Sequence, residues 1–82
     1  MPTVLRIDGY EIMIYRHDHL PPHVHVFTGE CETIVNLHCP KGEPDIREVF
    51  HCKAKQAKGA LKVVKKHQEL LCAMWEEIHG NL

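Results

Sequence analysis

The spacing of the apolar residues changes near residue 53, and this change constrains the fold more than any other feature of the sequence. Before it, short runs of β-branched and aromatic residues alternate with polar ones, a period of two that is typical of half-buried strands. After it, apolar residues recur at steps of three and four, the period of an amphipathic helix. The sequence therefore predicts one α+β domain: residues 1–38 form a β meander, residues 39–52 a loop, and residues 53–80 a helical segment that covers the sheet.

The β half contains three or four strands that are expected to pair in antiparallel order. Asp8-Gly9 is a two-residue hairpin signal, and Gly29-Glu30 reads as a second turn. In the second run Ile12 and Ile14 share one face, so that face is expected to pack against the core. The runs are residues 3–7, 10–16, 23–28 and 31–37.

The helical half carries one apolar stripe that is interrupted only by Gln68. Its members are Ala57, Leu61, Val64, Leu71, Trp75 and Ile78. Gly80 supplies a C-terminal stop. The stripe is longer than a typical globular helix, so it predicts either one long kinked helix or two helices that meet near His67, and we prefer a break at that point. The preceding segment HCPKGEPD, residues 38–45, is expected to be a loop because two prolines and a glycine cannot continue a sheet interior.

Composition places the chain among ordinary globular proteins. It has 82 residues, 10 Lys and Arg against 11 Asp and Glu, and 44% apolar residues. No apolar run approaches the roughly 20 residues that span a bilayer, and no signal sequence is recognisable, so no membrane contact and a cytoplasmic location are expected. So short a chain has a small core, and a homo-oligomer or a partner is expected to add to its stability.

The four cysteines are expected to be free thiols, because they lack the close spacing of a disulfide framework. One alternative is a structural zinc site formed by two adjacent pairs, His38-Cys39 and His51-Cys52. That signal is weak, since neighbouring residues in an extended chain point apart.

Residues 17–26, HDHLPPHVHV, hold four of the eight histidines and form the main candidate site. In a strand His23 and His25 project from the same face, and two prolines stiffen the approach that carries Asp18 and His19. We take the candidate catalytic residues to be Asp18, His19, His23 and His25. Imidazoles with a carboxylate suit Zn, Mn, Fe or Ni, and they also suit general acid/base work near neutral pH. The alternative is that these histidines have only a structural role.

No resident cofactor is expected at this cluster. The candidate ligands come from one loop and one strand, so any divalent metal ion at His23 and His25 is expected to be labile and its binding to depend on pH. Whether the chain is an enzyme stays open on these grounds.

A second cluster is basic. Six lysines fall within residues 53–66, which contain no acidic residue. Lys58, Lys62 and Lys65 share the helical face opposite the apolar stripe, where they could contact phosphate groups of a nucleic acid or an acidic protein partner. A solvated face that only keeps the protein soluble is the alternative.

The N-terminal MPTVLRIDGY, the central DHLPPHVHV and the closing segment with Trp75, His79 and Gly80 together resemble the domain of unknown function 4160 family of small bacterial and phage-borne proteins. The resemblance places the family motif on Asp18, His19, Pro21, Pro22, His23 and His25. The sequence departs from the family pattern at His17, at Cys52 and in the weight of its lysine-rich stretch.

The resemblance implies a genomic neighbour of the domain of unknown function 2442 family and a role as the toxin of a toxin-antitoxin pair. Our first hypothesis is therefore a toxin component that acts, or binds a neighbour-encoded antitoxin, through the histidine strand. The alternatives are a metal-dependent hydrolase or nuclease-like enzyme that uses the Asp/His cluster, and a non-catalytic subunit of a protein complex.

Overall fold

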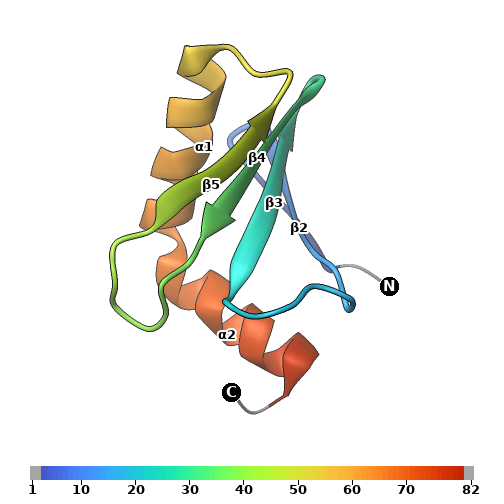
Figure 1. Cartoon of the computed structure of the whole chain (residues 1–82), viewed down its shortest axis with the longest axis vertical. Helices are drawn as coiled ribbons and strands as arrows, with labels where there is room; N and C mark the ends of the chain where they lie inside the picture. The colour runs from blue at the N-terminus through green and yellow to red at the C-terminus, as the bar shows by residue number, and fades with distance from the viewer. Residues whose placement is uncertain (1–2, 81–82) are drawn as a thin grey trace.

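A computed structural model describes residues 3–80 as one antiparallel sheet with two C-terminal helices (Figure 1). The α+β class predicted from the sequence is confirmed. The elements are β1 Thr3–Ile7, β2 Tyr10–Ile14, β3 His23–Thr28, β4 Cys31–Asn36, β5 Asp45–Phe50, α1 Ala54–Lys66 and α2 Gln68–His79.

The five strands lie in the order in which they occur in the chain, β1-β2-β3-β4-β5, and each pairs antiparallel with the next. The first turn has positive φ at both Asp8 and Gly9, 51° and 82°, as a type I′ hairpin requires. Gly29 has a φ of 56° in the turn that joins β3 to β4. The predicted meander and both of its turns are therefore confirmed.

The prediction of three to four strands is wrong by one, because β5 forms within the segment that was expected to be a loop. All six of its residues are exposed, and β5 is an edge strand with a neighbour on one side only. Its pairing with β4 also has a register shift between Ile34 and Val35. An exposed edge strand with such a shift shows no alternation of apolar and polar residues, and that alternation is the signal on which the prediction relied.

The helical segment breaks at His67, as preferred from the sequence. His67 ends α1 and precedes α2 with a φ of −116° and a ψ of 20°, outside the helical range. Gln68, the polar residue in the apolar stripe, donates hydrogen bonds from Nε2 to the carbonyl oxygens of Leu37 and Gly42 at 2.8 and 2.7 Å. The interruption of the stripe therefore ties the start of α2 to the loop between β4 and β5.

The core lies between one face of the sheet and the two helices, which cover only that face (Figure 1). Alternation along β2, β3 and β4 sends apolar members inward, as expected for Ile12 and Ile14. The buried cluster comprises Ile12, Ile14, Val24, Val26, Val35 and Leu37 from the strands and the residue after β4, and Ala60, Val63, Val64, Leu71 and Trp75 from the helices.

The expectation of free thiols is wrong. Cys31 is bonded to Cys52 and Cys39 to Cys72, with Cα separations of 4.5 and 5.8 Å. The first pairing depends on the hairpin of β4 and β5, which brings the first residue of β4 beside the segment after β5. Because β5 has no alternating pattern, this proximity could not be deduced from the sequence.

The alternative zinc site at His38, Cys39, His51 and Cys52 is also ruled out in this structure, because Cys39 and Cys52 belong to different disulfides. The cytoplasmic location stays a prediction. Free thiols would have agreed with it, but all four cysteines form disulfides. Among the described residues, neither helix has the length and apolar character needed to cross a bilayer.

Candidate metal centre

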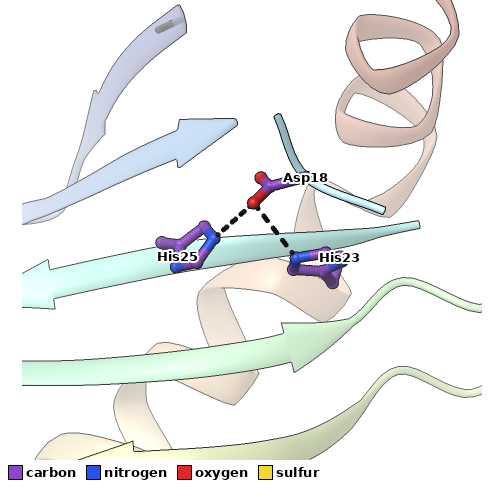
Figure 2. Close-up of side chains that lie close together, drawn as sticks. All are labelled: Asp18, His23 and His25. Carbon is purple, nitrogen blue, oxygen red and sulfur yellow. Dashed lines mark hydrogen bonds and ion pairs between the residues drawn. The ribbon is translucent and has the colours of Figure 1, made fainter. Parts of the chain in front are cut away.

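Asp18, His23 and His25 place one potential ligand atom each within 4.8 Å of the other two. Figure 2 shows the Asp18 carboxylate between the two imidazole rings, on the loop that leads from β2 to β3. Asp18 Oδ1 lies 3.1 Å from His25 Nε2 and 3.4 Å from His23 Nε2. The three residues thus form a two-histidine, one-carboxylate cluster, which we call the triad.

His23 is the first residue of β3 and is 5% exposed. Its Nδ1 lies 2.9 Å from the carbonyl oxygen of Pro21, two residues earlier. Its ring also contacts Trp75 of α2, with a centroid separation of 5.4 Å. The loop and α2 therefore fix the orientation of the His23 imidazole, and Nε2 points toward Asp18.

His25 is held in the same way by a different partner. Its Nδ1 lies 2.9 Å from Glu32 Oε2 on β4, and the edge of Tyr15 packs against its ring with a centroid separation of 4.8 Å. In the β3–β4 register Glu32 lies opposite Phe27, diagonal to His25 on the same face of the sheet. This contact leaves Nε2 of His25 free to face Asp18.

Asp18 is fixed by a tight turn at the end of β2. The backbone N–H of Asp18 donates to the carbonyl oxygen of Tyr15, and the backbone N–H of Tyr15 donates to Asp18 Oδ2 at 2.9 Å. Burial alone would raise the pKa of the Asp18 carboxyl, but the Tyr15 N–H and the His25 ring outweigh burial and lower it below its usual value. The Asp18 carboxyl is therefore negatively charged at neutral pH.

The hydrogen bonds on the outer nitrogens decide which atoms meet at the centre. The Pro21 carbonyl can only accept, so Nδ1 of His23 carries a proton; the Glu32 carboxylate likewise accepts from Nδ1 of His25. In the neutral imidazoles both Nε2 atoms then present lone pairs toward a carboxylate oxygen. Three acceptors cannot share one point unless a cation lies among them, and that cation is either a proton on an imidazole or a metal ion.

The spacing of Asp18 Oδ1 from each histidine suits a metal ion. Ligand atoms about 2.0–2.2 Å from a metal ion lie roughly 3–3.6 Å apart in tetrahedral or octahedral arrangements. The two separations that involve Asp18 Oδ1 fall within that range. Histidines that ligate metals generally donate the other ring N–H to a carbonyl or a carboxylate, and both histidines here do so.

The sequence of the chain was compared with models of known protein families. A family model described as a domain of unknown function, DUF4160, matches residues 9–76. The chain belongs to this family. The matched region contains the whole triad and Glu32, so the cluster lies within the DUF4160 domain and not in an appended segment. No curated protein and no solved structure matches the chain.

The structure brings together three of the four candidate residues from the sequence analysis. His19 is exposed and is not among the residues whose ligand atoms converge, although it follows Asp18 directly. His17 is exposed as well. The turn at Tyr15 therefore positions Asp18 and the Pro21 carbonyl positions His23, whereas His19 lies on the solvent side of the loop.

Two supporting residues, Glu32 and Tyr15, were missed by the sequence analysis. Glu32 could have been found, because the turn at Gly29-Glu30 fixes the register that places it diagonal to His25. Tyr15 belongs to the run 10–16 that was expected to form a strand, but it was not assigned to the site. Burial, followed by the charges of Glu32 and Asp18, raises the pKa of the Tyr15 hydroxyl, so Tyr15 stays neutral beside the triad.

The lysines that the sequence singled out lie on a different element. Lys58, Lys62 and Lys65 are exposed on α1, on the side away from its buried alanines and valines. Lys65 forms an ion pair of 2.7 Å with Glu43 in the loop before β5. Any contact of these lysines with a partner is therefore a separate feature from the triad.

Proposed function

We propose that the chain is a metal-dependent hydrolase in which Asp18, His23 and His25 hold one divalent transition-metal ion. The observation that carries the proposal is the convergence of three acceptor atoms whose outer hydrogen bonds are already made. A divalent ion held by two histidines and one carboxylate supplies Lewis acidity, which polarises the bond to be broken and activates water for its hydrolysis. Three protein ligands would leave coordination positions of the ion free for water and substrate.

The residues of the chain would divide the work in this reaction. Asp18 supplies the negative charge that favours a cation, and Pro21 and Glu32 hold the two imidazoles in the ligating tautomer. Trp75 and Tyr15 pack against His23 and His25 and limit their rotation. This support comes from one loop, two strands and a helix, so the geometry depends on the whole fold.

Metal binding can be measured directly, because Trp75 is the only tryptophan and its ring contacts His23. Metal-free protein titrated with Co²⁺ is expected to bind one equivalent, with quenching of Trp75 emission and the visible absorption of a histidine-bound Co²⁺ ion. Asp18→Asn and His25→Gln are expected to weaken binding at least about tenfold, since each removes one of three ligands. His17→Gln is the matched control, an exposed histidine of the same loop.

Saturation without quenching, or equal affinity in the control and in Asp18→Asn, would contradict the metal site. In that case the cation among the three acceptors is a proton, and the triad is a structural ion pair. Hydrolysis is then assayed with an activated phosphodiester, an ester and a single-stranded RNA, each with and without Zn²⁺ or Mn²⁺. If the protein binds metal but hydrolyses none of these three substrates in a metal-dependent way, the hydrolase proposal is rejected and the domain is a metal-binding domain.

For the cellular role we propose the toxin component of a toxin-antitoxin pair, with the lysines of α1 as contacts for an acidic partner or for phosphate groups. Support comes from the family resemblance and from the exposure of Lys58, Lys62 and Lys65. Expression in a bacterial host is expected to slow growth, and Asp18→Asn is expected to relieve the effect while His17→Gln does not. Equal growth inhibition by folded Asp18→Asn would separate toxicity from the triad.

A further inference from the structure

The outer edge of β5 is an unpaired strand edge with apolar side chains in solvent. Every residue from Asp45 to Phe50 is exposed, and Ile46, Val49 and Phe50 retain 38%, 47% and 43% of their accessible surface. β4 pairs with one side of β5, and the sheet ends at the other side. A strand edge that offers free N–H and C=O groups together with apolar side chains is a template for a further strand.

The register shift in β5 places its two aliphatic side chains on one face. Ile46 lies opposite Val35 and Val49 lies opposite Thr33, and both of these β4 residues point into the core. Residues three apart in a regular strand would face opposite sides. Because the shift adds one residue at Arg47, Ile46 and Val49 both extend the core layer beyond the end of the sheet.

The sequence of β5, DIREVF, is complementary to itself when it is reversed. Antiparallel pairing of two copies about the point between Arg47 and Glu48 sets Ile46 opposite Val49 of the second copy, and Val49 opposite Ile46. The same pairing sets Arg47 opposite Glu48 in both directions. The two aliphatic residues therefore meet each other on the same face, and the central arginine and glutamate meet the opposite charge, while Asp45 falls opposite Phe50 at each end of the paired segment.

We propose that β5 is a self-association edge on which a second copy of this chain docks in antiparallel orientation, which joins two five-stranded sheets into one. A two-fold arrangement uses the same edge on both copies, so it closes at the dimer. Of the devices with which proteins block strand addition, the edge contains no lysine and no proline, and its bulge at Arg47 recurs in both copies of the symmetric pairing. Because Arg47 and Glu48 have opposite charges, a second copy can pair both of them, whereas a strand of uniform charge would repel one of them.

Sedimentation equilibrium from micromolar to millimolar concentration tests the proposal. The wild type is expected to form a reversible dimer, and Val49→Lys is expected to raise its dissociation constant at least about tenfold, because the change sets a lysine ammonium against Ile46 of the other copy in both halves of the interface. Leu70→Lys is the matched control: Leu70 is an apolar residue of α2 that is also 47% exposed. Circular dichroism and Trp75 emission report whether each variant remains folded.

A charge exchange keeps the test valid even if Val49→Lys fails to fold. Arg47→Glu alone sets two carboxylates opposite one another, and Glu48→Arg alone sets two guanidinium groups opposite one another, so each is expected to weaken the dimer. The double variant R47E/E48R restores both pairs and is expected to recover wild-type association. A wild type that stays monomeric, single variants that dimerise normally, or a double variant as weak as the single ones would overturn the proposal.

Discussion

Glu32 illustrates at the residue scale how a side chain outside the triad can control it. Its carboxylate accepts from Nδ1 of His25 at 2.9 Å, and this contact fixes the tautomer that exposes Nε2. Glu32→Ala is expected to lower metal affinity about 10–100-fold, the usual effect of removing such a partner. Glu32→Gln retains an acceptor and is expected to lose less. Isothermal titration with Zn²⁺ measures both, and equal affinity of Glu32→Ala and the wild type would contradict the role.

Gly59 of α1 lies so close to the Tyr10 hydroxyl that a larger residue is not expected to fit. It lies in the middle of α1, where alanine normally stabilises a helix by about 1 kcal/mol. A Cβ built on Gly59 would overlap the Tyr10 hydroxyl of β2, with the ring carbon Cζ next at 3.1 Å. Gly59→Ala is therefore expected to destabilise the fold by about 1–3 kcal/mol.

Tyr10→Phe provides the control for this change, because it removes the hydroxyl and keeps the ring. In that background Gly59→Ala is expected to cost clearly less, since only the ring carbon remains close. Urea unfolding of the four proteins gives the coupling between the two sites. Strictly additive effects on the free energy of unfolding would show that the Tyr10 hydroxyl is not the reason position 59 requires glycine.

At the element scale, α2 is attached to the sheet through the loop between β4 and β5. The Gln68 amide donates to Leu37 O and Gly42 O. Gln68→Ala is expected to lower stability by about 1–3 kcal/mol, because carbonyl oxygens lose their donor. Gln68→Glu is expected to cost more at neutral pH, where the carboxylate cannot donate and faces carbonyl oxygens. Thermal unfolding at neutral and acidic pH separates the two, since protonation restores a donor only in Gln68→Glu.

The start of β5 is stabilised by a charge that can be titrated. The Asn36 side-chain amide, together with His38, lowers the pKa of the exposed Asp45 carboxyl below its ordinary value. A depressed folded-state pKa means that the ionised carboxyl stabilises the fold above pH about 3.8, and that this contribution is lost as the pH falls through the lower folded value. Asn36→Ala is expected to return the Asp45 pKa toward its ordinary value in a carbon-detected NMR titration. An unchanged Asp45 titration would contradict this assignment.

The sequence predicted those elements whose patterns repeat without interruption. Strands β1 to β4 alternate regularly, and the helical stripe continues on both sides of His67, so both halves and the break between the helices were predicted. The exposed edge strand β5 was not, because burial imposes no pattern on it and the shift at Arg47 breaks the period. Three members of the candidate site followed from strand alternation and from the two prolines, whereas Glu32 required the register of the neighbouring strand.

At the scale of the whole molecule, the two disulfides link segments that belong to different layers. Cys31–Cys52 joins the start of β4 to the segment before α1, and Cys39–Cys72 joins the loop after β4 to α2. The first therefore ties the entrance of the helical half to the sheet, and the second ties its last helix to the same sheet. The hydrophobic core of so small a domain is limited, so such links are expected to carry a large share of the stability.

The disulfides close chain segments of 21 and 33 residues, and loops of this length are expected to contribute about 3–4 kcal/mol each in the chain-entropy account. The variants Cys31→Ser with Cys52→Ser, and Cys39→Ser with Cys72→Ser, are expected to unfold at lower urea concentration by corresponding amounts. Removal of the Cys39–Cys72 disulfide should also loosen α2, which holds Trp75 against His23. The Cys39/Cys72 double variant is therefore expected to bind metal more weakly than the Cys31/Cys52 double variant. Urea unfolding and Co²⁺ titration of both double variants measure the two effects, and free thiols found by thiol titration of the unreduced wild type would contradict the pairing itself.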